Sequence, residues 1–507
     1  NNNEVRALYQ DRSGVIWIGT RGGGINKFNP NSVFSYLHDN SNERGVRAIV
    51  DDKLGSLWIS KRRGVFKYNI HNGKTKKMLD KQALSLYVDS FGYIWLGCLD
   101  GTVYKYDHKK GGFKTYQILD HENNSRNNII SFCEDDNHDL WIGTDGRGLY
   151  RFDPDTEQVI EHYEKNTNGS ISGNEIYTIY KDSKDRLWIG TNYGLNLYER
   201  DKKKFTKYSD GYVYSIYEDS KTGLWFGSRT GLYNLKLDSI KNINDNKLRL
   251  FNMKDGLSNN MIFSILDDNS GNLWLSTSFG ITKFDIDKLN FRNYSKIYGL
   301  QDNKFYPACF TKTQDGELYF GGLKGITSFY PDEIKVNKKP PPIVITDFKK
   351  NGKSIFLNKP INSIEKINLS HKDLFFSIEF AALDFIDPEE NKYAYKLVGF
   401  DKGWNYTGNR RYSSYTNLDP GKYTFRVKGA NSDGIWNEKG KSILLNIAPA
   451  FWQTEWFKGL IIVSVLILSF IFYKYKTVKI RKRNKKLEKE VSKRSLSLKK
   501  AKKRLEK

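Results

Sequence analysis

Residues 11–24, DRSGVIWIGTRGGG, bring together residue types that could bind a phosphate. Three glycines follow a basic residue, and backbone amides of glycine-rich loops can cradle phosphate groups. A phosphate-binding loop of this kind also needs a Gly-Lys-Ser/Thr end and a helix after it, and this stretch is followed by neither. The stretch therefore lacks a complete phosphate-binding motif, and its residues are better explained by the element that they build.

The part of this stretch from the Asp to the aromatic residue occurs eight times along the chain, with Thr313 in place of the Asp in the last. Successive aromatic residues lie 37 to 49 residues apart, and a four-stranded unit with that period is typical of a propeller blade. The eight aromatic residues are Trp17, Trp58, Trp95, Trp141, Trp188, Trp225, Trp274 and Tyr319. Alternating apolar positions predict four strands in each repeat, as in EIYTIYKD, RLWIGT, LNLYER and KFTKY of the fifth.

The other shared residues of the repeat suit a tight turn. Asp11 can accept hydrogen bonds from backbone amides of the turn that it opens, and Gly14 can supply a positive φ there. His138 and Asp185 take the glycine position in two repeats, and in another the glycine moves by one residue to Gly223. The Trp has the bulk to fill the space between adjacent blades. We interpret the Asp, the Gly and the Trp as scaffold.

The number of blades is open at this point. Eight repeats over residues 1–337 could close an eight-bladed ring, or they could form a seven-bladed propeller with one additional blade from an array truncated at the N-terminus. The expected fold class is all-β in either case.

A β-sandwich is expected after the propeller. Three prolines in KKPPPIVITDF (338–348) break the repeat period, and short alternating strands separated by Gly, Asp and Asn turns follow. This pattern predicts an immunoglobulin- or fibronectin-like sandwich of about seven strands over residues 338–450.

Residues 456–475 are long and apolar enough to cross a bilayer as a helix. Trp452 and Trp456 on one side, with Tyr473 and Tyr475 on the other, suit the two membrane interfaces. Lys and Arg crowd only the C-terminal flank, so we expect a single-pass protein of a bacterial inner membrane. Residues 1–455 would then be periplasmic and residues 476–507 cytoplasmic.

The tail after this segment is strongly basic. Residues 474–507 hold 17 Lys and Arg against 3 Glu, which is 14 of the 24 net positive charges, so the total charge does not indicate nucleic-acid binding. Apolar residues on heptad positions predict a parallel coiled coil, with Arg494 as an exception; contact with anionic lipid and a merely solvated helix are alternatives. The heptad residues are Leu487, Val491, Leu498, Ala501 and Leu505.

The sequence indicates neither a cofactor, nor a metal site, nor a catalytic residue. Cys98, Cys133 and Cys309 are far apart in apolar runs, which predicts small buried side chains rather than disulfides or zinc ligands. The seven histidines are scattered without an HExxH pair. A propeller glycosidase or lyase is therefore the weaker interpretation.

Residues 391–436 resemble the triple-tyrosine domain, with Tyr395, Tyr415 and Tyr423 as counterparts of its tyrosines. Together with the WIGT repeats, the chain resembles the periplasmic sensor region of a hybrid two-component system. The resemblance implies two seven-bladed propellers, of which this chain would lack most of the first, and a homodimer through the sandwich and the coiled coil. It also implies a histidine kinase, a receiver and a DNA-binding output beyond residue 507.

The tail departs from the family in one place, because Ser495–Leu498 stand where the family usually reads Thr-x-Glu-Leu. A diguanylate cyclase or a directly attached DNA-binding domain is the alternative output. The function implied by the resemblance is the detection of an oligosaccharide and control of polysaccharide-utilisation genes.

A ligand is expected on the face that carries the turns after WIGT. Arg can pair with a carboxylate or sulfate, and aromatic rings can stack on sugars, so these turns suit an anionic oligosaccharide; ordinary solvated turn residues are the alternative. The candidate residues are Arg21, Arg62, Arg63, Arg147, Tyr193, Arg229, Phe279 and Lys324. Loops 120–128 and 164–174 would line the same face.

Overall fold

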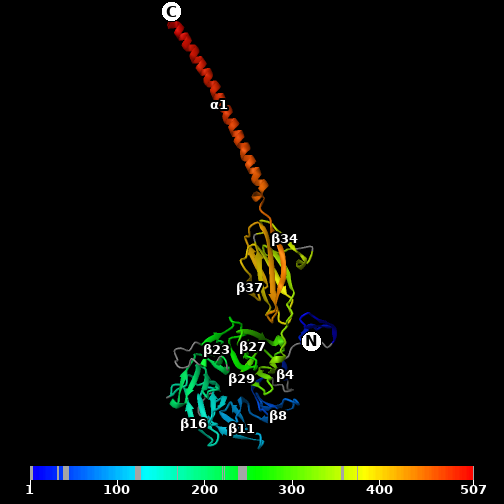
Figure 1. Ribbon diagram of the computed structural model, residues 1–507, viewed down its shortest axis with the longest axis vertical. Coiled ribbons are helices and arrows are strands. Elements are labelled where there is room, and N and C mark those ends of the chain that lie inside the picture. Colours follow the sequence, from blue (N-terminus) through cyan, green and yellow to red (C-terminus); the bar gives the residue numbers. More distant parts are fainter. Residues whose placement is uncertain are drawn as a thin grey trace. The chain divides into compact units, whose positions relative to one another are not determined.

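A computed structural model of the 507-residue chain divides it into two units, Asn1–Asn337 and Lys338–Lys507 (Figure 1). The described residues are 4–30, 34–37, 45–119, 127–167, 169–219, 221, 223–237, 248–355, 359–373 and 375–505.

Seven four-stranded antiparallel sheets form the propeller. Blade 1 consists of β5 (Val46–Asp51), β6 (Ser56–Lys61), β7 (Gly64–Asn69) and β8 (Thr75–Leu79). Blade 2 consists of β9 (Ala83–Val88), β10 (Ile94–Cys98), β11 (Thr102–Asp107) and β12 (Gly112–Gln117). Blade 3 consists of β13 (Ile129–Glu134), β14 (Leu140–Thr144), β15 (Leu149–Asp153) and β16 (Gln158–Tyr163). Blades 4 and 5 are β17 (Ile176–Lys181), β18 (Leu187–Thr191), β19 (Gly194–Glu199) and β20 (Lys204–Lys207); and β21 (Val213–Asp219), β22 (Gly223–Ser228), β23 (Leu232–Leu235) and β24 (Arg249–Phe251). Blade 6 is β25 (Ile262–Asp267), β26 (Asn272–Thr277), β27 (Gly280–Asp285) and β28 (Asn290–Tyr294).

The N-terminal segment completes the seventh blade. Its strands are β29 (Phe305–Lys312), β30 (Leu318–Gly322), β31 (Gly325–Phe329) and β4 (Ser35–Leu37). The first strands of successive blades are neighbours around the ring, and β29 lies against β5. The propeller expected from the sequence is therefore confirmed, and the ring closes with seven blades.

The first repeat does not form a blade of this ring. Its strands β1 (Val5–Gln10), β2 (Ile16–Thr20) and β3 (Gly24–Phe28) make a separate three-stranded sheet, and its fourth strand, β4, pairs with β31 instead. The expectation of four strands for every repeat is wrong for the last repeat, which supplies the three strands β29, β30 and β31, and the first repeat places its fourth strand in another sheet. Pairing with β4 satisfies the backbone groups of β31, which would otherwise be an open sheet edge.

An Asp opens this turn in blades 1 to 6, and Thr313 takes its place in blade 7. In blade 4, Oδ1 of Asp182 accepts the backbone N–H groups of Lys184 and Arg186, and Oδ2 accepts the indole N–H of Trp188 at 2.8 Å. Asp185 takes the glycine position with a φ of 58°. These bonds explain the six-residue spacing between Asp and Trp, and they confirm the predicted turn chemistry.

The Trp and the Gly of WIGT hold adjacent blades together. Trp188 is fully buried, and it packs beside Val213 in a cluster that spans blades 4 and 5. A Cβ on Gly190 would lie 2.6 Å from Cγ2 of Thr178 and 2.8 Å from Cγ1 of Val213, the first residue of the next blade. The glycine is therefore required by the close approach of the next blade, and not by its own backbone angles.

The second unit contains a sandwich of nine strands in two sheets, two more strands than expected. One sheet has the order β33 (Lys353–Ser354), β32 (Ile343–Lys350), β35 (Phe375–Ala382) and β38 (Tyr412–Thr416). The other has the order β34 (Lys366–Leu369), β40 (Trp436–Ile447), β39 (Gly421–Ala430), β36 (Lys392–Val398) and β37 (Asn405–Gly408). The difference comes from β33 and β37, short edge strands that weak alternation does not reveal.

The three tyrosines of the predicted triple-tyrosine domain all hydrogen bond within the sandwich. Tyr415 is buried, and its hydroxyl donates to Asp401 at 2.7 Å. Tyr423 donates to the carbonyl of Asp419 at 3.0 Å, and the hydroxyl of Tyr395 accepts from Arg410 at 3.3 Å. Burial and the bond to Asp401 raise the pKa of Tyr415, so it stays a neutral phenol.

The C-terminal part of the chain is one helix, α1 (Glu455–Leu505). Among the described residues it is the one helix long and apolar enough to cross a membrane, and the apolar window is not buried against other parts of the chain. The predicted membrane segment and the predicted tail helix are therefore continuous. The three cysteines are buried and free, as expected from the sequence.

Candidate functional site

The turns between the second and third strands of the blades lie on one face of the ring, here called the turn face. In blades 3, 4 and 6, a Thr at the end of the second strand shapes the turn. In blade 4, the hydroxyl of Thr191 donates to the carbonyl of Gly194 and accepts the N–H of Tyr193, both at 3.0 Å. Thr277 accepts the N–H of Phe279 at 2.9 Å in the same way. This threonine fixes the backbone of the residue that varies from repeat to repeat.

Seven of the eight predicted ligand residues lie on the turn face. They are Arg62 and Arg63 of blade 1, Arg147 of blade 3, Tyr193 of blade 4, Arg229 of blade 5, Phe279 of blade 6 and Lys324 of blade 7. Arg21 occupies the corresponding turn of the separate sheet β1–β3, where its guanidinium lies 3.4 Å from Glu4. The structure therefore does not bring Arg21 together with the other seven.

The turn residues differ in how they are held. Lys324 is paired with Asp302 at 3.0 Å. Burial would raise the pKa of Asp302, but the hydrogen bond and the charge of Lys324, together with hydrogen bonds from the backbone N–H groups of Asn303 and Lys304, lower the pKa overall. Arg229 stacks over the ring of Tyr212 at 5.5 Å, and the side chains of Tyr193 and Phe279 are each about half exposed. Blades 4 to 6 thus present two aromatic rings and an arginine side by side along the ring.

A second set of residues on this face was missed by sequence reasoning. In the first six blades, the first strand contains a β-bulge immediately after its first buried residue; in β29 the irregular stretch runs from Phe305 to Phe310. Bulges redirect a side chain and are frequent beside functional sites. We call the residues that follow the first buried one the bulge ring: Arg47, Leu84, Ile130, Tyr177, Tyr214, Phe263 and Tyr306.

The bulge ring and the turns belong to the same face. In blade 5, Val213 pairs with Ser228, the residue before Arg229, and Tyr214 is the next residue along β21. The bulge-ring residues lie on the first strands, which are the strands that neighbour one another around the ring. The turn residues therefore lie outside the bulge ring on the same face.

Aromatic side chains gather on one side of the bulge ring. Tyr177, Tyr214 and Phe263, from three consecutive blades, form a continuous cluster with Tyr212, and we call these four residues the aromatic arc. Ring centroids lie 5.0 Å apart for Tyr177 and Tyr214, 5.6 Å for Tyr214 and Phe263, and 5.9 Å for Tyr212 and Tyr214. All four side chains are half-buried, so packing holds them while part of each ring faces solvent.

Two phenols of the aromatic arc, those of Tyr177 and Tyr214, remain neutral. The hydroxyl of Tyr177 donates to Glu175 at 2.5 Å, and burial together with this bond raises the pKa of Tyr177. Burial also raises the pKa of Tyr214. These two tyrosines therefore offer uncharged ring faces and hydroxyl groups at neutral pH.

The rest of the bulge ring is different. Leu84 and Ile130 take the bulged positions of blades 2 and 3. Arg47 of blade 1 stacks over the ring of Tyr306 at 4.3 Å. A signal for the whole set exists in the sequence, since each bulged residue directly follows the first apolar residue of a repeat, as in IYTI, VYSI and IFSI.

The two loops expected on this face have separate outcomes. Residues 120–126 of the first loop lie outside the described part of the chain. In the second loop, the carbonyl of Asn174 accepts the N–H groups of Gly146 and Gly148, and the amide N–H of Ser172 donates to the side chain of Asn196. These residues support the turns of blades 3 and 4.

The family comparisons agree with this architecture. The model of the family Two component regulator propeller matches residues 1–22, 125–146, 170–193, 207–230 and 256–279, and the model of the Y_Y_Y domain matches residues 384–448. The chain is similar to the sensor regions of two-component systems. The resemblance expected from the sequence is confirmed.

One relative and one solved structure show how much of the chain this similarity covers. Histidine kinase P4 of Formosa agariphila is 28% identical over 471 residues, which cover 90% of this chain and 32% of that protein. The extracellular domain of a hybrid two component system from B. thetaiotaomicron is 30% identical with a TM-score of 0.71, over 89% of this chain and 62% of that one. The chain thus spans about a third of the curated relative and less than two thirds of the solved domain.

Proposed function

We propose that this chain is the sensing and membrane-spanning part of a two-component signalling protein that detects an oligosaccharide outside the cytoplasm. The observation that carries the proposal is the similarity, over 89% of the chain, to the extracellular domain of a hybrid two component system. The candidate membrane helix α1 adds a route by which a signal outside could reach the cytoplasm.

The proposed orientation follows from charge. Lys and Arg crowd the C-terminal side of the apolar part of α1, and cytoplasmic flanks of membrane helices carry such an excess. Residues 1–455 would lie in the periplasm and residues 476–507 in the cytoplasm, with α1 crossing a bacterial inner membrane.

The turn face is the proposed ligand-binding surface. Arg62, Arg63, Arg147 and Arg229 give it a positive charge, and the aromatic arc gives it ring faces. Arginine recognises carboxylate and sulfate groups through paired N–H donors, so an anionic oligosaccharide fits this surface better than a neutral one.

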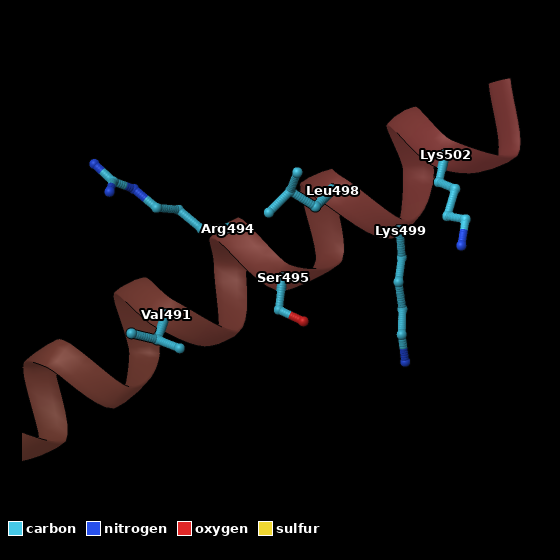
Figure 2. A pocket seen from close by; sticks show the side chains of 6 residues that line it. All are labelled: Val491, Arg494, Ser495, Leu498, Lys499 and Lys502. Carbon is cyan, nitrogen blue, oxygen red and sulfur yellow. The ribbon is translucent and has the colours of Figure 1, made fainter. Parts of the chain in front are cut away.

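The proposed signal passes through a homodimer. Val491 and Leu498 continue an apolar heptad seam along α1, and Figure 2 shows Arg494 and Leu498 on one side of the helix with Lys499 and Lys502 on the other. Two such helices can pair as a parallel coiled coil. A ligand transmits a signal only if it binds one arrangement of the dimer more tightly than the other.

The proposed output is a histidine kinase that controls genes for polysaccharide use. Its support is the relative named a histidine kinase, which covers 90% of this chain. Within this chain no residue is proposed to be catalytic.

A titration of the full chain in lipid nanodiscs tests the ligand proposal. Calorimetry is carried out with neutral oligosaccharides (xylo- and manno-oligosaccharides) and with acidic ones (oligogalacturonides and chondroitin sulfate fragments). We expect saturable binding of an acidic oligosaccharide that is recovered unchanged. Absence of binding across the panel, or cleavage of a bound glycan, would contradict the proposal.

A further inference from the structure

We infer that the aromatic arc is a stacking subsite for one sugar ring, and that Arg229 binds an acidic substituent on that ring. The inference rests on the proposed function, and it deepens that function by naming a site and a chemical class of ligand. None of the four arc residues was a candidate from the sequence.

The arc brings together aromatic rings from equivalent positions of neighbouring blades. Tyr177, Tyr214 and Phe263 come from the same bulged position of three neighbouring strands, with successive ring centroids 5.0 and 5.6 Å apart. A pyranose ring has one apolar face of C–H groups, and tyrosine offers an apolar body with a polar tip. Ring faces with a few fixed polar groups are the usual composition of a small-ligand site.

The side chains of the arc are already fixed in place without a ligand. Tyr177 is anchored by its bond to Glu175, and Tyr212 packs against Tyr214 with centroids 5.9 Å apart. Side chains that are already ordered lose little conformational entropy on binding. Each bulge changes the direction in which its aromatic side chain points. In a regular strand the same residue would follow the usual alternation, and its side chain would point in a different direction.

The side chain of Arg229 is placed to bind an anion. Its guanidinium lies over Tyr212, the side chain is exposed, and no carboxylate of the described part of the chain forms an ion pair with it. Lys324 of blade 7, in contrast, is occupied by Asp302. A guanidinium stacked on a ring keeps its edge of N–H donors, which fits a carboxylate or sulfate bidentately.

The neighbouring turn residues extend the same surface. Tyr193 and Phe279 lie in the turns of the two blades beside Arg229, and Lys165 lies 4.0 Å from the ring of Tyr193. A ligand longer than one sugar could therefore contact further rings and a further cation on either side of the arc. The chemical class is an oligosaccharide that contains a uronic acid or a sulfated sugar.

The bulge ring offers matched controls. Leu84 and Ile130 occupy the same bulged position in blades 2 and 3 and are half-buried like the arc residues. Leu84→Ala and Ile130→Ala therefore make a comparable change at the ring without touching the arc.

The experiment measures affinities of the full chain in nanodiscs for oligogalacturonides, for their uncharged methyl esters, and for sulfated chondroitin fragments as a second acidic probe. We expect Tyr214→Ala to weaken binding by about tenfold, as for loss of one stacking contact. Arg229→Gln should weaken binding of the acidic probe by about tenfold and leave its uncharged counterpart within about twofold. Leu84→Ala and Ile130→Ala should leave both affinities unchanged.

The outcomes separate the inference from the proposed function. If the wild-type chain binds an acidic oligosaccharide and the arc variants bind it equally well, or the control variants weaken it as much, the inference is overturned and the proposed function stands. If the wild-type chain binds no glycan, both are overturned. Thermal unfolding of each variant checks its fold, and Tyr212→Leu, which lies outside β21, replaces Tyr214→Ala if that chain does not fold.

Discussion

The three-stranded sheet β1–β3 and blade 4 have the same repeat sequence but different surroundings. Asp11 accepts the indole N–H of Trp17 at 2.9 Å, as Asp182 does for Trp188, and Gly14 has the positive φ of the turn. Yet Trp188 is fully buried, whereas Trp17 is only half-buried. Leu8, Tyr9 and Ile25 of the sheet are exposed by 67%, 66% and 75%.

This difference teaches which part of the repeat is local. The turn and its hydrogen bonds form in both places, so they depend only on residues within the repeat. Burial of the Trp needs the next blade, because each blade supplies one wall of its neighbour's core. Stability is then largely a sum of terms between neighbouring repeats, as in other repeat proteins.

Removing the Trp should give the largest contrast. Trp188→Ala should destabilise blades 4 and 5 by about 3–5 kcal/mol, because it leaves a cavity between them. Trp17→Ala should cost about 1 kcal/mol or less within β1–β3, because little of its burial comes from a neighbour. Amide hydrogen exchange of β18 and β2 measures both effects. Equal losses at the two positions would contradict the comparison.

The second contrast concerns Phe34, which directly precedes β4. This strand follows the sheet β1–β3 in the chain and pairs with β31 of the ring. The ring of Phe34 is buried against Phe329 and Tyr294, with centroids 4.9 and 5.4 Å away. Phe34→Ala should cost about 3 kcal/mol and speed exchange of amides in β4 and β31. Exchange in β1–β3 should not change. Unchanged protection of β31 would show that β4 does not close the ring.

The glycine of WIGT gives a third contrast. Gly190→Ala should cost about 1–3 kcal/mol, because its Cβ would lie 2.6 Å from Thr178 and 2.8 Å from Val213. Gly19→Ala should be close to neutral, because the nearest atom is Cβ of Ala7 at 3.5 Å. Thermal unfolding of the two variants, read at the same local probes, compares them. A costly Gly19→Ala would mean that β1–β3 is packed as tightly as the ring.

The smallest contrast is in the response to acid. Burial would raise the pKa of Glu134, but hydrogen bonds from Ser90 and His138 lower it overall. A carboxyl whose pKa is lowered in the folded state stabilises the fold at pH values above its pKa in the unfolded chain, which is near 4.5. This stabilisation is lost as the pH falls through the pKa of the folded state. Between pH 6 and pH 3, blades 2 and 3 should lose about 1 kcal/mol, which Glu134→Gln should largely remove.

The first sheet provides the control for this prediction. Gln10 stands where Glu134 stands, directly before the Asp of the turn, and it cannot titrate. Hydrogen exchange in β1–β3 should therefore show no counterpart of this loss. An identical acid response in the Glu134→Gln chain would show that the Ser90 bonds do not contribute.

Much of the scaffold could be predicted from the sequence, because its chemistry is local. The Asp-to-Trp spacing, the left-handed positions of His138 and Asp185, and the four strands of the fifth repeat are all confirmed. The partner of β4 could not be predicted, because a three-residue strand carries no information about which sheet edge it joins. That choice depends on closing the ring, which is a property of all seven blades together.

The candidate site was predicted only in part for a similar reason. Tyr193, Arg229 and Phe279 lie on the turn face as expected, since a turn is visible in sequence. Tyr177, Tyr214 and Phe263 could not be singled out from the sequence, because a β-bulge depends on the register between two strands, which the alternation of residues along one strand does not reveal.

The central claim is that a ligand on the turn face changes how two α1 helices pair. Leu498→Cys places a thiol on the heptad seam, and the three native cysteines are buried, so disulfide formation in nanodiscs reports this pairing. We predict that a saturating acidic oligosaccharide changes the rate of Leu498→Cys cross-linking, and that the added change Tyr214→Ala shifts this response to higher ligand concentration. A rate that is the same with and without bound oligosaccharide would contradict the account.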